Sequence, residues 1–228
     1  MKQQSIVFFD LEAAGAASQT QHVFQWAYAC EQQHKKGEEL GGLLETLREA
    51  RWLCAHNLLA HDSRYLPTYP ETSSFLAPGQ QAIDTLYLSA LLFAEHPYHR
   101  LVKDYRMDSL HSDPLEDVGL LQNLFWDCVE AWNRLPLPLK DIYAWLLQSH
   151  VGWQGFLSWV AQDIPNWEIK QGAQLIQSYF KGRACQQWDK INAWLTQESA
   201  VVAYGLALMQ TAGLPSILPP WLVQQYPQ

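Results

Sequence analysis

The sequence predicts an α/β fold in its first part and a helical subdomain after it. Up to about residue 135, apolar segments of strand length alternate with segments of helical periodicity. After residue 138 the segments all have helical spacing, and Pro136 and Pro138 separate the two patterns. The expected domains are therefore an α/β domain over residues 1–135, an all-helical subdomain over 136–213, and a Pro-rich tail or linker over 214–228.

The first half of the α/β part is expected to begin with a buried strand. Ile6, Val7, Phe8 and Phe9 are consecutive β-forming residues. The segment HVFQWAYAC has the composition of a second strand, and GLLETLREA has helical periodicity. The expected order is strand 6–11, strand 22–30, loop or short edge hairpin 31–40, helix 42–50 and strand 51–57.

The second half contains a longer run of helices. A short helix over 60–66 and a loop over 67–80 are expected before the apolar segment 82–93. In this segment Asp84 is expected to begin a helix as its N-cap, with structural pairing near the site as the alternative. A long amphipathic helix follows within 110–135. The five helices expected after it are 139–149, 151–162, 169–180, 184–195 and 199–211. Their Trp and Tyr side chains are expected to lie in the core, with stacking on nucleic-acid bases as the alternative.

Composition places the chain among ordinary globular proteins. The 228 residues are 48% hydrophobic and 17% charged, and no apolar run reaches the roughly 20 residues of a membrane span. Asp10 and Glu12 come too early for a secretory signal, so we expect a cytoplasmic protein. The widely spaced cysteines, which we expect to be reduced core thiols, are Cys30, Cys54, Cys128 and Cys185.

The net charge of −8 argues against a protein that coats nucleic acid by bulk electrostatics. An acidic protein can still bind nucleic acid through metal ions and a local groove, or through a separate basic partner.

Four carboxylates stand at strand ends or helix starts. Asp10 and Glu12 are two residues apart in a strand and therefore project from one face. By itself this pair fits a polar strand end that runs into a turn at Gly15. Asp62 follows a later strand, and Asp117 lies in the first turns of a helix. Strand ends of an α/β sheet gather along one rim, where two divalent cations would neutralise about four negative charges.

Three segments resemble the motifs of the DnaQ-like (DEDD) exonucleases. They are FFDLE, HNLLAHDSRYL and HSDPLEDVGLL, in the family's order, and the resemblance covers roughly residues 6–130. Ala55 stands where the family often has Gly. The resemblance implies a ribonuclease H-like mixed sheet flanked by helices and 3′–5′ exonuclease activity. It also implies that two Mg²⁺ or Mn²⁺ ions are held by Asp10, Glu12, Asp62 and Asp117.

The resemblance implies a general base as well, where this sequence departs from the pattern. One branch of the family has a His five residues before its last Asp, and that position here is Ser112. His111 is one residue away and is the base we expect, with His99 as the alternative. The other branch would have Tyr where Asp113 stands, and we expect Asp113 to be the N-cap of its helix or an extra ligand.

Contacts with substrate are expected from three further residues: Asn57, His99 and Lys103. The pair His56 and Asn57 could instead only tie loop backbone groups together, and the resemblance implies that the Asn holds its motif against the first strand. Lys103 belongs to a basic cluster with Arg100 and Arg106, which fits either a solvated face or contact with phosphates. His61 is expected to pack where the family has Phe.

A narrower likeness concerns four other segments: DTLYLSALLF, PYHRLVKDY, DPLEDV and LPPWLVQQYP. They resemble the N-terminal region of large bacterial proteins in which an exonuclease-like domain precedes a RecQ-like helicase. This implies an excised domain or a free-standing relative, a helicase partner in the same or another chain, and DNA as the substrate.

Three hypotheses follow. The first is a metal-dependent 3′–5′ exonuclease that releases nucleoside monophosphates from DNA. The second is a catalytically weak or silent module that docks a helicase or another protein, which the acidic net charge and the displaced His favour. The third is a ribonuclease on short RNA with the same site. All four carboxylates are present, which favours an enzyme over a silent module.

Overall fold

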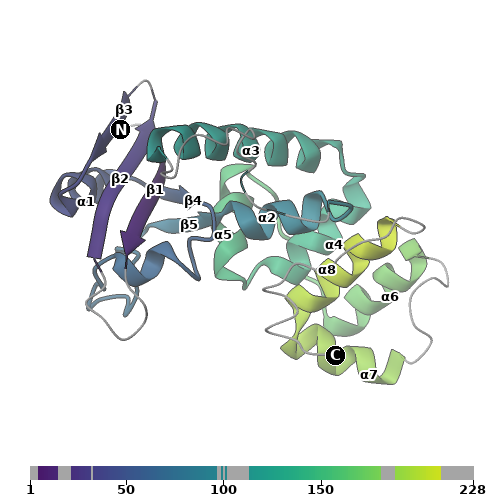
Figure 1. Ribbon diagram of the computed structural model, residues 1–228. Coiled ribbons are helices and arrows are strands. Elements are labelled where there is room, and N and C mark those ends of the chain that lie inside the picture. Colours follow the sequence, from purple (N-terminus) through teal and green to yellow (C-terminus); the bar gives the residue numbers. More distant parts are fainter. Residues whose placement is uncertain are drawn as a thin grey trace. The chain divides into compact units, whose positions relative to one another are not determined.

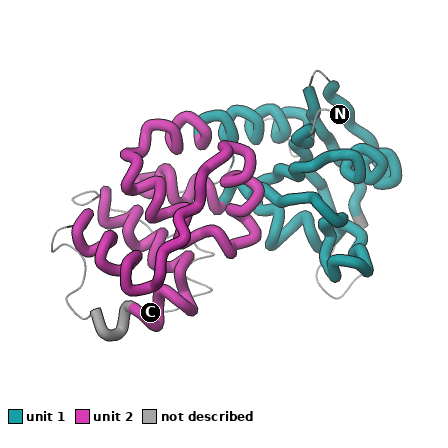
Figure 2. Tube along the Cα trace, turned by 180° about the vertical axis from the view of Figure 1, so that it is seen from behind, with its two compact units in different colours: residues 1–86, 100–127 teal, residues 87–99, 128–228 magenta. Residues whose placement is uncertain are grey.

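The computed structural model describes residues 5–14, 22–31, 33–96, 99, 101, 113–180 and 188–211. The chain forms two compact units, which Figure 2 distinguishes by colour. Unit 1 comprises Met1–Leu86 and Arg100–Asp127, and unit 2 comprises Tyr87–His99 and Cys128–Gln228. The domain boundary near residue 136 that the sequence indicates remains a prediction.

Unit 1 is built on a five-stranded mixed sheet with the strand order β3-β2-β1-β4-β5 (Figure 1). β1 and β2 are antiparallel, as are β2 and β3, whereas β4 is parallel to both β1 and β5. The α/β class expected from the sequence is confirmed. The strands are β1 (Ile6–Ala14), β2 (His22–Cys30), β3 (Gln33–Gly37), β4 (Trp52–Ala55) and β5 (Gln81–Asp84).

The two faces of β1 have different partners because successive side chains alternate. Phe9 and Leu11 belong to a buried cluster with Leu43 and Leu47 of α1 (Leu40–Glu49). On the opposite face, the Phe8 ring packs edge to face against Phe125 of α3 (Pro114–Arg134), with centroids 5.2 Å apart. Asp10 and Glu12 share the face of Phe8, so the sheet presents them on the side that α3 covers.

The segment between β4 and α3 contains both expected helices and one strand that was not expected. The short helix is a 3₁₀ turn, η1 (Asp62–Tyr65), and the apolar helix is α2 (Thr85–Leu92). Immediately before α2, the strand β5 occupies Gln81–Asp84, which the sequence did not indicate. Asp84 therefore ends a buried strand and also caps the helix, because its Oδ1 accepts a hydrogen bond from the Leu86 N–H at 3.1 Å.

The remaining helices follow the expected order: the helix expected over 169–180 has these bounds, and the others differ by a few residues at one or both ends. Trp132, Trp153 and Phe156 are fully buried and contact one another in unit 2. This confirms that the core contains many of the helical aromatic residues, although Trp126 and Trp194 are more than half exposed. These helices are α4 (Leu137–Leu147), α5 (Val151–Trp159), α6 (Ile169–Phe180), α7 (Trp188–Gln197) and α8 (Ser199–Gln210).

Among the described helices, none combines the length and the apolar character required to cross a membrane. The tail, 214–228, lies outside the described residues.

Candidate metal centre

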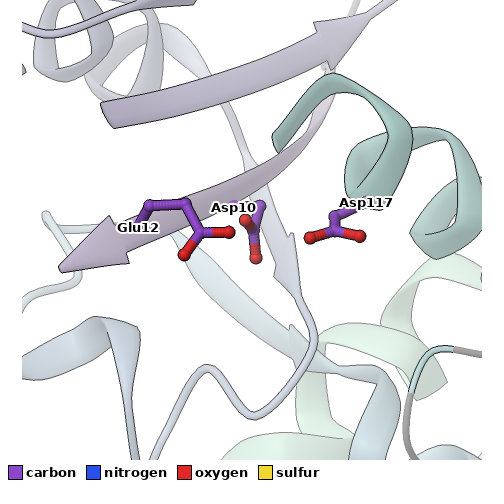
Figure 3. A group of neighbouring side chains, drawn as sticks. All are labelled: Asp10, Glu12 and Asp117. Carbon is purple, nitrogen blue, oxygen red and sulfur yellow. The ribbon is translucent and has the colours of Figure 1, made fainter. Parts of the chain in front are cut away.

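Three of the four predicted carboxylates come together in unit 1. Asp10 and Glu12 project from β1 and Asp117 projects from α3, with one carboxylate oxygen of each within 4.8 Å of the others (Figure 3). Asp10 and Glu12 are partly buried and Asp117 is buried. The strand spacing and the helix start predicted this grouping.

Local structure explains how α3 presents Asp117. Asp113 caps the helix, because its Oδ1 accepts a hydrogen bond from the Leu115 N–H at 3.1 Å, and Pro114 follows as the first helical residue. The expectation of an N-cap at Asp113 is thereby confirmed. Val118 and Leu121 are buried, and this stripe of α3 packs inward with Asp117 at its N-terminal end.

A divalent cation fits this donor set. Carboxylate oxygens are the ligands preferred by hard cations, and metal–oxygen distances of about 2.1–2.4 Å let one ion join oxygens roughly 4–5 Å apart. Three partly desolvated carboxylates at this spacing repel one another, and a cation between them would remove that repulsion. The triad of Asp10, Glu12 and Asp117 could therefore hold a metal ion.

The fourth predicted carboxylate, that of Asp62, is not part of this triad. It is buried, and the backbone N–H of Leu11, the residue between Asp10 and Glu12, acts to lower its pKa. The strand pairing of β1 with β4 ends at Phe8. Burial raises the pKa of Asp62, while hydrogen bonds from His61 and from backbone groups act in the opposite direction.

His61 occupies a position for which the sequence analysis expected only packing. Its Nδ1 lies 3.3 Å from Asp62 Oδ1, and although its ring contacts Tyr65, 45% of the side chain is exposed. The hydrogen bond with Asp62 raises the His61 pKa, and the negative charge of Asp10 adds to this effect. The expected packing is present as the contact with Tyr65, and the sequence analysis did not foresee the additional contact with Asp62. The adjacent His and Asp in the sequence were the signal that could have indicated this contact.

The pair His56 and Asn57 stands in the loop that leads to Asp62. His56 Nδ1 lies 3.0 Å from Thr85 Oγ1, and Asn57 adopts a left-handed backbone with φ of 66° while its N–H donates to Asp84 Oδ1 at 2.9 Å. The Asp84 side chain holds the loop backbone here, and the role expected of the His56 and Asn57 side chains in tying loop backbone groups together remains a prediction. Contact of Asn57 with substrate remains a prediction.

The structure does not test the roles expected of the other site residues. His99 belongs to unit 2, where burial, followed by the charge of His96, lowers its pKa to about 4. His111 and Lys103 lie outside the described residues, as do Arg100 and Arg106. The identity of the general base and the basic contacts with substrate therefore remain predictions.

Comparison with known proteins gives few similarities. No model of a known protein family matches the sequence, and no curated protein matches it. The family B DNA polymerase from the hyperthermophilic archaeon Pyrobaculum calidifontis aligns with a TM-score of 0.40 and 11% sequence identity. The alignment covers 78% of this chain and 29% of the polymerase chain, so the chain spans less than a third of that protein.

Proposed function

We propose that this protein is a metal-dependent 3′–5′ exonuclease of the DnaQ-like type, with single-stranded DNA as the expected substrate and nucleoside monophosphates as products. One observation carries the proposal: the carboxylates of Asp10 and Glu12 on β1 and of Asp117 on α3 meet within 4.8 Å. The mixed sheet flanked by helices agrees with the ribonuclease H-like fold that the motifs imply.

The chemistry follows from the charge of the site. Two divalent cations at this site, Mg²⁺ or Mn²⁺, would supply two effects: a lower pKa for a water molecule and stabilisation of the leaving oxygen of a phosphodiester. Asp10, Glu12, Asp62 and Asp117 would hold these cations. Asp10 and Glu12 do so from a rigid central strand, which fixes the distance between them better than a loop would.

The remaining residues handle protons and substrate. Water attacks phosphorus, the bond to the 3′ oxygen of the preceding nucleotide breaks, and the proton of the water passes to a base, for which we propose His111. His61 lies beside Asp62, where it orients that carboxylate through its Nδ1. Lys103 and His99 are the proposed contacts with the substrate phosphates. A RecQ-like helicase domain, in the same or a partner chain, is the proposed partner.

The test is digestion of single-stranded DNA and RNA, each labelled at the 3′ or the 5′ end, in the presence of Mn²⁺. Mononucleotides should be released from the 3′ end of DNA, and EDTA should stop the reaction. Asp117→Asn should reduce the rate to the level found with EDTA. Glu116→Gln is the matched control, because Glu116 is the neighbouring carboxylate of the same helix but is exposed.

Three results would count against the proposal. An Asp117→Asn variant as active as the wild-type protein would show that the activity comes from another site. The absence of release from any substrate by folded protein would favour the docking module, and release from RNA alone would favour the ribonuclease.

A further inference from the structure

The buried carboxylate of Asp84 holds three backbone N–H groups from two different segments. Its Oδ1 accepts from Asn57 at 2.9 Å and from Leu86 at 3.1 Å, and its Oδ2 accepts from Leu59 at 3.0 Å. Asp84 itself is the last residue of β5. One side chain thus joins the end of a strand, the start of α2 and the loop that follows β4.

This arrangement is too costly to be a helix cap alone. Asp84 has no exposed surface, and burial raises its pKa to about 7 against the effect of its three hydrogen bonds. An exposed Ser, Asn or Asp would cap α2 through one N–H without this desolvation. Two of the three hydrogen bonds come from backbone N–H groups of the loop. An ordinary cap lacks such bonds, so the second role of this carboxylate concerns the loop.

The loop that follows β4 contains no helix or strand, and few hydrogen bonds within the loop hold its shape. Asn57 is in the left-handed region with φ of 66°, which is uncommon for a residue other than Gly. The His61 N–H donates to the Asn57 carbonyl at 2.9 Å, and the Ser63 N–H donates to the Leu58 carbonyl at 2.9 Å. The N–H groups of Asn57 and Leu59 point to Asp84 from inside this turn.

The end of the loop delivers Asp62 to β1. Asp62 begins η1, and its buried carboxylate lies near the Leu11 N–H, between the metal-binding candidates Asp10 and Glu12. Hydrogen bonds therefore lead from Asp84 through the loop and His61 to Asp62.

We infer that Asp84 is a positioning residue for the site: by fastening residues 57–59, it sets where the Asp62 carboxylate meets Leu11 beside the acidic triad. The inference rests on the proposed function as far as metal binding is concerned, but the positioning itself is a property of the metal-free protein. Asp84 does not contact the reacting atoms and acts only through Asp62.

Asp84→Asn is the variant that carries the test. The amide oxygen keeps an acceptor for Asn57 and Leu86, whereas the amide nitrogen faces the Leu59 N–H, so that donor meets donor. The change keeps the size of the side chain and removes one loop contact, and the protein should fold. Asp84→Ala, which removes all three hydrogen bonds, gives the larger effect where it folds.

Gln80→Ala provides the matched control in the same unit. Gln80 also makes three hydrogen bonds with backbone groups: its Nε2 donates to the carbonyls of Leu47 and Ala50 at 2.7 and 2.9 Å, and its Oε1 accepts from Ala77 at 2.9 Å. The segment that it fastens carries none of the site residues. Its loss should destabilise unit 1 without moving Asp62.

Hydrogen exchange of the metal-free proteins measures the positioning, and calorimetric titration with Mn²⁺ measures its consequence. In Asp84→Asn, the amides of residues 57–63 and of Leu11 should exchange faster, and the Mn²⁺ affinity should fall about 10- to 100-fold. In Gln80→Ala, the exchange rates of these amides and the Mn²⁺ affinity should match those of the wild-type protein. Unchanged exchange at Leu11 in Asp84→Asn would overturn the inference, as would an unchanged Mn²⁺ affinity.

The two proposals fail in different ways. If the wild-type protein does not bind Mn²⁺, the proposed function fails, while exchange at Leu11 still decides whether Asp84 positions Asp62. If the wild-type protein binds Mn²⁺ and Asp84→Asn binds it equally well, only the inference about Asp84 fails.

Discussion

Phe8 and Phe125 pack edge to face, with ring centroids 5.2 Å apart and planes at 66°. Phe8 lies two residues before Asp10 on one face of β1, and Phe125 lies eight residues after Asp117, two turns further along one side of α3. Packing between these rings therefore fixes the strand and the helix that bring the carboxylates together. A purely apolar contact sets the geometry of a charged site.

Phe125→Ala should destabilise the protein by about 3–5 kcal/mol, because it leaves a cavity against β1. Trp126→Ala, at the adjacent but exposed position, should cost about 1 kcal/mol or less. Urea unfolding followed by circular dichroism measures both. Equal losses of unfolding free energy in the two variants would contradict the importance of the contact between Phe8 and Phe125.

Mn²⁺ should raise the melting temperature of the protein, because a ligand that binds only the folded state stabilises it by about 2.7 kcal/mol at 100 times its Kd. Glu12→Gln should lose this increase. In EDTA the variant should melt no lower than the wild-type protein, because one of three mutually repelling charges is gone. Differential scanning calorimetry with and without Mn²⁺ is the measurement. A variant that retains the full increase would remove Glu12 from the metal site.

The stability of the protein should fall in acid partly because of His99. Burial lowers the His99 pKa from its ordinary value of 6.5 to about 4, so the unfolded chain binds the proton more readily than the folded protein. The contribution of His99 to stability is complete above pH 6.5 and declines as pH falls towards 4, by at most about 1.4 kcal/mol per pH unit. In His99→Leu, the free energy of unfolding should depend less steeply on pH over this window. The same slope in both proteins would contradict the assignment.

Two glycines in unit 2 should respond in opposite ways to alanine. A Cβ on Gly172 of α6 would lie 2.4 Å from the Trp145 ring, whose Nε1 is held by a hydrogen bond to the Trp167 carbonyl at 3.0 Å. Gly172→Ala should therefore destabilise the protein by about 1–3 kcal/mol through overpacking. Gly205 of α8 has nothing within 4 Å of the added carbon, so Gly205→Ala should stabilise it by about 0.5–1 kcal/mol. Thermal unfolding of the two variants should show melting temperatures on either side of the wild-type value.

Much of the architecture could be predicted because its pattern is local. The β-forming residues at 6–9 indicated β1, and the amphipathic period indicated α3. β3 was expected only as one of two alternatives, since most of its residues are exposed at the sheet edge and lack an alternating apolar pattern. β5 was missed because four residues are too few to separate a strand from the apolar helix that follows.

The candidate site also has features that the sequence predicts and features that it does not. The grouping of Asp10, Glu12 and Asp117 follows from strand alternation and a helix start. The position of Asp62 near the Leu11 N–H depends on where the β4 pairing stops, which no local pattern records. Asp84 was expected as a cap, but its bonds to Asn57 and Leu59 join residues 25 or more positions apart.

In the part of the chain that the structure describes, β1 continues to Ala14 although its pairing with β4 stops at Phe8. A strand edge is a template on which another chain can add a strand, and charge near the edge discourages that association. Negative charge stands beside this part of β1 in the carboxylates of Asp10 and Glu12. Variants that neutralise them carry a risk of self-association, so their monodispersity has to be established before a loss of activity is attributed to the loss of metal.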